Sequence, residues 1–294
     1  MNQALFLAAE KAYSKMSQNS PELRFSSFRA RKRLGYEIKK VFGGGRSGGI
    51  SVKTFWGVSL RAPSSEAASL YYYGALGQEE RGTIAYFIRT LGPGDIFYDI
   101  GAHCGFYGLL AQQLIHGGEI HIFEASPAIF SYLEKNFPKD SKNIFLNNYA
   151  VSEKNGTTTF YDGTAVSQGG SSTLVPEVAQ GIAGHIAVEV PSITLERYAE
   201  RHAAPTVIKM DTEGSEEYII RGASGMLKSY KPSIIMEVWH GSASRFSRRA
   251  VGTLLELGYA PHRILDTGYA ERIDHIDFDH ETSDGSNYLF RHVS

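Results

Sequence analysis

Two acids and two glycines between residues 99 and 124 form the first group in this chain that could do chemistry. Asp99 ends an apolar run, Gly101 and Gly105 follow it, and Glu124 ends the next apolar run. A glycine-bearing turn lets a ligand approach the backbone, and an acid about 20 residues further on accepts hydrogen bonds from a ribose diol. The pattern predicts a site for a ligand that contains a nucleoside.

The residues around the two glycines favour one of two common ligands. A dinucleotide needs the spacing G-x-G-x-x-G, but residues 102–104 separate Gly101 from Gly105. Asp99 would repel a pyrophosphate and is a better match for a cationic, amino-bearing ligand. With Glu124 for the ribose, the best candidate is S-adenosyl-L-methionine, and a nicotinamide cofactor is the alternative. A turn cap at Asp99 and a merely solvated Glu124 would be the purely structural interpretation.

A second acid-rich stretch, TVIKMDTEGSEEY, follows a later apolar run. Lys209, Asp211 and Glu213 occupy alternate positions, so their side chains point the same way unless the strand already ends at Asp211. This strand is expected beside the first one, which turns Asp211 toward the reactive end of the ligand. Glu216 and Glu217 are expected to be helix-start residues, because the helix dipole favours carboxylates there.

Glu237 and His240 lie near the end of the next apolar run. A hydroxyl group is a poor nucleophile while it holds its proton, so methyl transfer to oxygen is helped by a general base. The catalytic candidates are Asp211 first, then His240 with its ordinary pKa near neutrality, and Glu237. An ion pair of Lys209 with Asp211 or Glu213 that only fixes the turn is one alternative. We expect a site without a metal ion. The other alternative is a magnesium or calcium ion held by Asp211, Glu213 and Glu237.

The elements that would position these residues alternate along the chain. Strand-like runs occur at 96–100, 119–123, 144–151, 206–211 and 233–239, and helical patterns occur at 106–116, 127–137, 215–228 and 244–257. The segment SNYLFRHVS offers a last strand. Such alternation predicts an α/β fold with a doubly wound, mostly parallel sheet. Ligands of such sheets bind at the carboxyl ends of the strands.

The N-terminal part differs in composition from the rest. Residues 1–49 form a basic extension, residues 50–93 a lead-in of strands and a helix, and residues 94–294 the main domain. Apolar side chains interleave with basic ones between Arg24 and Arg46. We expect a helix that packs on the main domain by its apolar side; a contact with a membrane surface or an acidic partner is the alternative.

Charge and composition exclude several classes of protein. The formal net charge of -1 argues against nucleic acid as a partner. The single cysteine, Cys104, excludes an internal disulfide framework and most thiolate metal sites. The N-terminus is a poor secretory signal, and no segment approaches the roughly 18 apolar residues of a spanning helix. A cytoplasmic protein is therefore expected.

Five sequence blocks resemble a known family. In order, they are GDIFYDIGAHCGFYG, IHIFEASP, LNNYAVSEKNGTTTFY, VIKMDTEGSEEYIIRGA and PSIIMEV. Their order and spacing are similar to those of FkbM-type methyltransferases that depend on S-adenosyl-L-methionine, over about residues 75–260. The resemblance implies a class I methyltransferase fold, with a seven-stranded sheet whose last strand is antiparallel.

The resemblance also implies positions that contact the cofactor. In chain order these are Glu80, Asp99, Gly101, Ala102, Gly105, Glu124, Ala125, Ser126, Asn148, Ala150 and Asp211. The positions from 99 to 105 would line the methionine end, those from 124 to 126 the ribose, and Asn148 and Ala150 the adenine. At the upstream acidic position, Glu79 is the alternative to Glu80.

These features predict an S-adenosyl-L-methionine-dependent O-methyltransferase that acts on a hydroxyl group of a sugar, glycolipid or secondary metabolite. A nicotinamide-dependent oxidoreductase and a non-catalytic cofactor-binding scaffold are the alternatives. The stretch from Asp162 to Val190 is rich in Gly, Ser and Ala. It is expected to be a long loop, acting as a lid or as part of the acceptor site.

Overall fold

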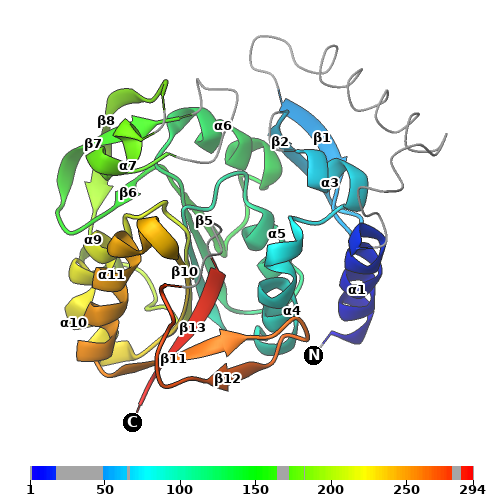
Figure 1. Cartoon of the computed structure of the whole chain (residues 1–294). Coiled ribbons are helices and arrows are strands. Elements are labelled where there is room, and N and C mark those ends of the chain that lie inside the picture. Colours follow the sequence, from blue (N-terminus) through cyan, green and yellow to red (C-terminus); the bar gives the residue numbers. More distant parts are fainter. Residues whose placement is uncertain are drawn as a thin grey trace. The chain divides into compact units, whose positions relative to one another are not determined.

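The computed structural model describes residues 2–17, 49–64, 67–163, 172–181, 183–279 and 286–293. The chain divides into two compact units (Figure 1). The first comprises Met1–Thr90 and Asp266–Gly268, and the second comprises Leu91–Leu265 and Tyr269–Ser294. Within the described parts of the chain, no helix is long and apolar enough to cross a membrane.

The first unit contains the expected short strands and helix. Its elements are α1 (Gln3–Ser17), β1 (Gly49–Lys53), β2 (Ser59–Pro63), α3 (Ala68–Tyr73), η2 (Gln78–Glu80) and α4 (Arg81–Thr90). β1 and β2 pair as an antiparallel hairpin. Arg81 at the start of α4 forms ion pairs with Glu10 of α1 at 2.8 Å and with Asp266 at 3.3 Å. The basic segment between Arg24 and Arg46 lies outside the described residues, so its contact with a membrane or an acidic partner stays a prediction.

The second unit is built on a large sheet. Among the described residues, eight strands form it in the order β12-β11-β13-β10-β9-β3-β4-β5. These strands are β3 (Ile96–Ile100), β4 (Glu119–Phe123), β5 (Ile144–Asn147), β9 (Val207–Met210), β10 (Ser233–Val238), β11 (Tyr259–Ile264), β12 (Ala270–Arg272) and β13 (Ser286–His292). The five strands from β5 to β10 are parallel, and β13 is antiparallel to both of its neighbours.

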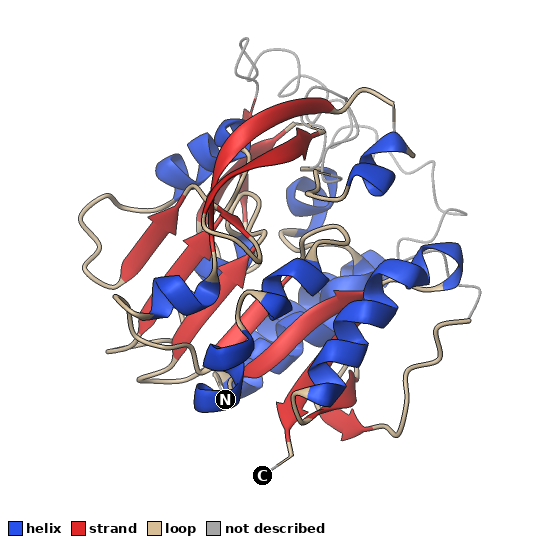
Figure 2. Cartoon of the chain, turned by 90° about the vertical axis from the view of Figure 1, so that its left-hand side faces the viewer, coloured by secondary structure: helices blue, strands red, loops and turns tan. Residues whose placement is uncertain are grey.

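The mostly parallel α/β sheet and the antiparallel last strand are as expected. The strand count is not, because the three-residue edge strand β12 pairs with β11 and makes eight strands instead of seven. In Figure 2 the strands of the sheet run side by side, with helices in front of them.

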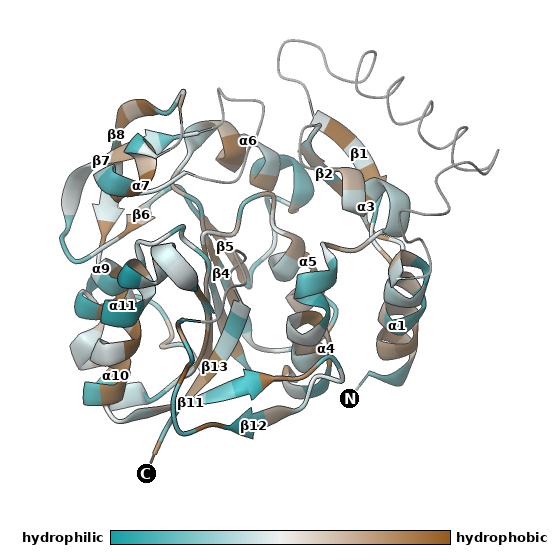
Figure 3. Cartoon of the chain, viewed as in Figure 1, coloured by the Kyte–Doolittle hydropathy of each residue, from teal (hydrophilic) through white to brown (hydrophobic). Residues whose placement is uncertain are grey.

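Helices cover the two faces of this sheet. They are α5 (Phe106–Gln112), α6 (Pro127–Asn136), α8 (Leu195–Ala199), α9 (Glu216–Arg221), α10 (Ser224–Tyr230) and α11 (Ser244–Glu256). Figure 1 shows α9, α10 and α11 on one side of the strands and α5 on the other. Hydrophilic and hydrophobic residues lie on opposite sides of α11 (Figure 3), as expected of a helix that packs on a sheet.

Alternation along β3 decides which face each side chain joins. Tyr98 and Ile100 belong to the core cluster that includes side chains of α8, α9, α10 and α11. Because successive side chains of a strand point to opposite faces, Phe97 and Asp99 point to the face that α5 covers. The predicted site residue Asp99 therefore stands on the same side of the sheet as α5.

Two predicted elements are interrupted. The run 144–151 is not one strand, since β5 ends at Asn147 and β6 (Ala150–Val151) pairs with another sheet. The helical pattern 215–228 divides into α9 and α10 at Gly222, whose missing Cβ leaves room for the carbonyl oxygen of Ser152.

The long loop expected from Asp162 to Val190 is only partly a loop. The described residues there include α7 (Pro176–Gln180) and the start of β8 (Ile186–Ile193). β8 pairs antiparallel with β7 (Gly156–Asp162) and parallel with β6, and these strands form a small three-stranded sheet. Residues 164–171 and 182 are outside the described residues.

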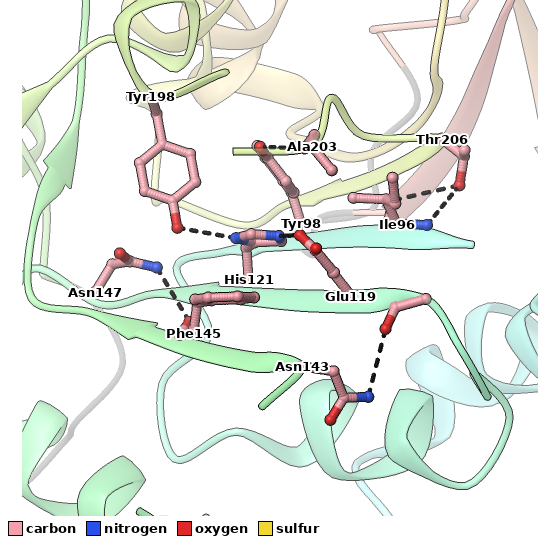
Figure 4. A network of polar contacts seen from close by, with 11 residues as sticks. Ile96, Tyr98, Glu119, His121, Asn143, Phe145, Asn147, Tyr198, Ala203 and Thr206 are labelled. Atoms are coloured by element: carbon pink, nitrogen blue, oxygen red, sulfur yellow. Dashed lines mark hydrogen bonds and ion pairs between the residues drawn. The ribbon is translucent and has the colours of Figure 1, made fainter. Parts of the chain in front are cut away.

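A buried polar network joins three neighbouring strands of the large sheet (Figure 4). His121 on β4 is fully buried; its ring stacks on that of Phe145 on β5 and lies 4.7 Å from that of Tyr98 on β3. Its Nδ1 is 2.9 Å from the Tyr198 hydroxyl, and its Nε2 is 2.9 Å from a carboxylate oxygen of Glu119. Because a carboxylate only accepts, Nε2–H donates to Glu119 and Nδ1 accepts from Tyr198.

This network predicts acid-sensitive stability. Burial lowers the pKa of His121 below its ordinary value of 6.5, although the hydrogen bond with Glu119 acts in the opposite direction. The unfolded chain then binds a proton that the folded chain does not, so stability is fully present above pH 6.5 and falls as the pH falls below it. We expect the free energy of unfolding to drop by about 1 kcal/mol or more between pH 7 and pH 5, since one pKa unit is worth about 1.4 kcal/mol.

Denaturant unfolding at the two pH values checks this expectation. The drop should be smaller in His121→Phe, which removes the titrating ring, and unchanged in His116→Gln, which alters an exposed histidine. If His121→Phe shows the same drop as the wild type, the buried imidazole is not the origin of the acid sensitivity.

Candidate functional site

The turn after β3 places the backbone of the first candidate group. The amides of Gly101 and Ala102 both donate to the carbonyl oxygen of Phe123 at 3.0 Å, which ties the turn to the end of β4. Gly101 has a positive φ of 76°, and a Cβ there would overlap the carbonyl oxygen of Asp211. Gly105 also has a positive φ and is the N-cap of α5, so the two glycines sit where the backbone requires them.

Asp99 is a buried carboxyl group with unused hydrogen-bonding capacity. It is 1% exposed, and within the described residues its Oδ2 atom has no hydrogen-bond partner. Burial raises the pKa of Asp99 to about 7, while the charge of Lys209 opposes this shift and the charges of Asp211 and Glu124 add to it. Asp99 thus senses the charges of the second candidate group, Lys209 and Asp211, as well as that of Glu124 in its own group.

Two backbone amides hold the carboxylate of Glu124. One carboxylate oxygen accepts from the amide of His103 at 3.0 Å, and the other accepts from the amide of Ser126 at 2.8 Å. Burial raises the pKa of Glu124 to about 7, against the effect of His103 and of the two amide hydrogen bonds. His103, which has a positive φ of 52°, therefore has a positioning role that its sequence neighbourhood did not reveal.

The residues next to Glu124 form a hydrogen-bonded rim. Ser126 caps α6 and donates from its hydroxyl to Asp162 at 2.9 Å. The Asn148 side-chain amide donates to the carbonyl oxygens of Glu124 and Ala125 at 2.8 and 3.2 Å. Ala150 differs from these residues, since it is buried in the small cluster of β6, β7 and β8. Glu80 ends η2 in the first unit, so its predicted cofactor role stays a prediction.

The second candidate group lies at the end of β9, directly beside β3 as expected. Lys209 is 2% exposed, and its ammonium group forms an ion pair with Asp211 at 2.8 Å. The strand ends at Met210, and Glu213 has a positive φ of 54°, so it leaves the alternation of the strand. One expected alternative, the Lys209–Asp211 ion pair, is therefore present.

Two further carboxyl groups favour their protonated forms. Burial raises the pKa of Glu213 to about 8, and the charges of Asp211 and Glu216 act in the same direction. Burial also raises the pKa of Glu237, with additional effects of Asp211 and Glu213, while a hydrogen bond from the Trp239 indole opposes the shift. Near neutral pH these carboxyl groups are poor proton acceptors, because each already holds a proton.

Glu216 is more than a helix-start residue. It begins α9, but its side chain is buried and one carboxylate oxygen accepts from both the amide and the hydroxyl of Thr212 at 2.9 Å. The turn from Asp211 to Ser215 is thereby fixed. The sequence signal that could have shown this is the spacing T-x-x-x-E at the strand-to-helix turn.

His240 lies at the same edge of the sheet, after the strand next to β9. It follows β10, is 6% exposed, and its Nε2 atom is 3.4 Å from the hydroxyl of Tyr288 on β13. Among the described residues, no group of three or more His, Cys, Asp or Glu side chains has an arrangement that could hold a metal ion. The magnesium or calcium alternative therefore gains no support from Asp211, Glu213 and Glu237.

The order of the parallel strands, with acids at their carboxyl ends, is that of a Rossmann-like α/β fold. The sequence model of the methyltransferase FkbM domain matches residues 99–266, more than half of the chain. The chain belongs to the FkbM methyltransferase family. This is a family of methyltransferases, and it gives no support to the oxidoreductase alternative.

Solved structures that resemble this chain share little sequence with it. The methyltransferase FkbM from Methylobacillus flagellatus KT is 14% identical, with a TM-score of 0.45, over 72% of this chain and 48% of that one. This chain therefore spans about half the length of that protein. The fibrillarin from Aeropyrum pernix, solved in complex with natively bound S-adenosyl-L-methionine, is 14% identical, with a TM-score of 0.43, over 83% and 98%. A search of curated proteins found no match.

Proposed function

We propose that the protein is an S-adenosyl-L-methionine-dependent O-methyltransferase that acts on a hydroxyl group of a sugar, glycolipid or secondary metabolite. The observation that carries the proposal is the pair of buried carboxyl groups, Asp99 and Glu124, on either side of the glycine turn. Both come from the carboxyl ends of adjacent parallel strands, where ligands of such sheets bind.

The residues present fit the two ends of this cofactor. The unpartnered Oδ2 atom of Asp99 offers an acceptor for an ammonium group, in a buried position where an unmet acceptor is costly. Each carboxylate oxygen of Glu124 uses one lone pair on a backbone amide and keeps another for a ribose hydroxyl. When bound, S-adenosyl-L-methionine supplies a methyl group on a positively charged sulfur.

Asp211 is the first candidate for the general base. It follows β9 at the same edge, its amide is tied to the carbonyl oxygen of Ile100, and its side chain is 31% exposed. The raised pKa values of Glu213 and Glu237 keep them protonated and leave Asp211 to accept the proton of the acceptor hydroxyl. The Lys209 ion pair orients its carboxylate. His240 stays the second candidate.

Binding of S-adenosylhomocysteine tests the ribose assignment. Glu124→Ala is expected to weaken binding about 100-fold, because hydrogen bonds to a charged group are worth about 1.5–3 kcal/mol each. Glu124→Gln, which keeps one oxygen acceptor for a backbone amide, should weaken it about tenfold. Titration calorimetry gives the dissociation constants.

A matched control separates this effect from a general loss of charge. Glu134→Gln makes the same substitution at an exposed position of α6 and should leave the dissociation constant unchanged. Equal affinity of the wild type and both Glu124 variants would remove the ribose assignment.

Mass spectrometry of an extract incubated with the protein and labelled S-adenosyl-L-methionine would identify the acceptor and the methylated atom.

A further inference from the structure

A pocket of about 580 Å³ opens at the same edge of the large sheet as the candidate site. Its lining includes His240 after β10, Tyr288 on β13, Arg263 on β11 and Arg272 on β12. The carboxyl ends of β10 and β11 and the amino end of β13 meet there, because β13 is antiparallel to both. The pocket thus begins at β10, the strand next to β9, and extends toward β13, β11 and β12. Its volume is in the range of small-molecule sites.

Two guanidinium groups in this pocket are available to a ligand. Arg263 and Arg272 are exposed, and within the described parts of the chain neither side chain forms an ion pair or a hydrogen bond. Nearby Arg248, in contrast, is paired with Asp279. Burial raises the pKa of Tyr288, and the charge of Arg263 opposes this shift, so Arg263 acts electrostatically on the pocket wall.

Hydrogen-bond acceptors also line this pocket. Asp274 and Asp277 come from the segment after β12, and one carboxylate oxygen of Asp277 accepts from the amide of Asp279 at 3.1 Å. Neither aspartate is paired with Arg263 or Arg272, although all four residues line one pocket. The pocket therefore presents donors for an anion as well as acceptors for hydroxyl groups.

We propose that this pocket binds an acceptor that is an acidic sugar, with a carboxylate or phosphate group on Arg263 and Arg272. Guanidinium groups match the planar, bidentate geometry of such anions, and the aspartates accept from the sugar hydroxyls. His240 lies at the pocket wall, and the hydroxyl group to be methylated approaches the candidate site beside it. The inference rests on the proposed function and narrows its acceptor class.

Binding of a simple anion tests the pocket separately from catalysis. Inorganic phosphate, followed by ³¹P line broadening on the full chain with S-adenosylhomocysteine present, should bind saturably. The double variant Arg263→Gln/Arg272→Gln should bind it about tenfold more weakly, since two charge-assisted contacts are lost. Arg201→Gln, at an exposed position after α8, should bind it like the wild type. Equal binding by the double variant, or no saturable binding by the wild type, would overturn the proposal.

Labelled products distinguish acidic from neutral acceptors. After incubation of an extract with labelled S-adenosyl-L-methionine, the labelled product should be retained on an anion exchanger. Phosphatase treatment would remove the phosphate from a labelled sugar phosphate, and the neutral sugar would then leave the exchanger. A labelled sugar acid would stay bound after the same treatment. A labelled product in the unbound fraction would contradict the acidic acceptor while supporting the O-methyltransferase. Failure of S-adenosylhomocysteine to bind would instead contradict the proposed function and leave the phosphate result as evidence for the pocket alone.

Discussion

Replacing Asp211 with Asn is expected to lower the rate of methyl transfer by about 10²–10⁴-fold, the contribution usual for a general base. Binding of S-adenosylhomocysteine should change little, because this ligand lacks the positive charge on sulfur that the carboxylate would attract. The measurement is labelled-methyl transfer into an extract that contains the acceptor, together with calorimetry of S-adenosylhomocysteine.

The buried partner of Asp211 complicates this substitution and also provides its control. Asp211→Asn leaves the Lys209 ammonium group, which is 2% exposed, without its ion-pair partner, and such a loss costs about 3–5 kcal/mol. In Lys209→Met/Asp211→Asn both charges are removed, so the fold should be closer to wild-type stability. Low activity in both variants supports the general base. Near-normal activity in the double variant would mean that the ion pair only fixes the turn.

Replacing Gly101 with Ala is expected to destabilise the second unit by about 3 kcal/mol or more and to abolish measurable S-adenosylhomocysteine binding. A left-handed backbone at a non-glycine residue costs about 1–2 kcal/mol, and the added Cβ overlaps the carbonyl oxygen of Asp211, which cannot move without its strand. The turn that ties β3 to β4 would shift, and with it the amide that holds Glu124. Thermal unfolding and calorimetry measure the two effects.

A second glycine isolates the overlap from the backbone conformation. Gly117 has a similar positive φ of 80°, but a Cβ there would meet nothing within 4 Å. Gly117→Ala should therefore cost only about 1–2 kcal/mol, from the left-handed backbone, and leave cofactor binding intact. If the two alanine variants are equally stable and bind equally well, close packing at Gly101 does not shape the site.

The first candidate group could be predicted from sequence because local spacing determines it. Asp99, Gly101, Gly105 and Glu124 sit at strand ends and turns, and parallel strands bring their carboxyl ends to one edge. The neighbouring position of β9 also follows from this topology. The structure places these four residues at the predicted strand ends and turns, because short-range rules determine where turns and strands form.

Other features depend on contacts that spacing does not encode. Most of β8 lies within the predicted loop, because Glu189 and Pro191 interrupt the apolar residues of this strand. Glu213 leaves the strand alternation because the chain takes a left-handed conformation there. The burial of Glu216 and the pocket at Arg263 depend on how distant elements pack.

The most direct test of the central claim is a crystal structure of the protein with S-adenosylhomocysteine. We expect both ribose hydroxyls within hydrogen-bond distance of the Glu124 carboxylate, and the ammonium group of the ligand beside Asp99. A ligand bound elsewhere, or with its ribose hydroxyls turned away from Glu124, would contradict the central claim.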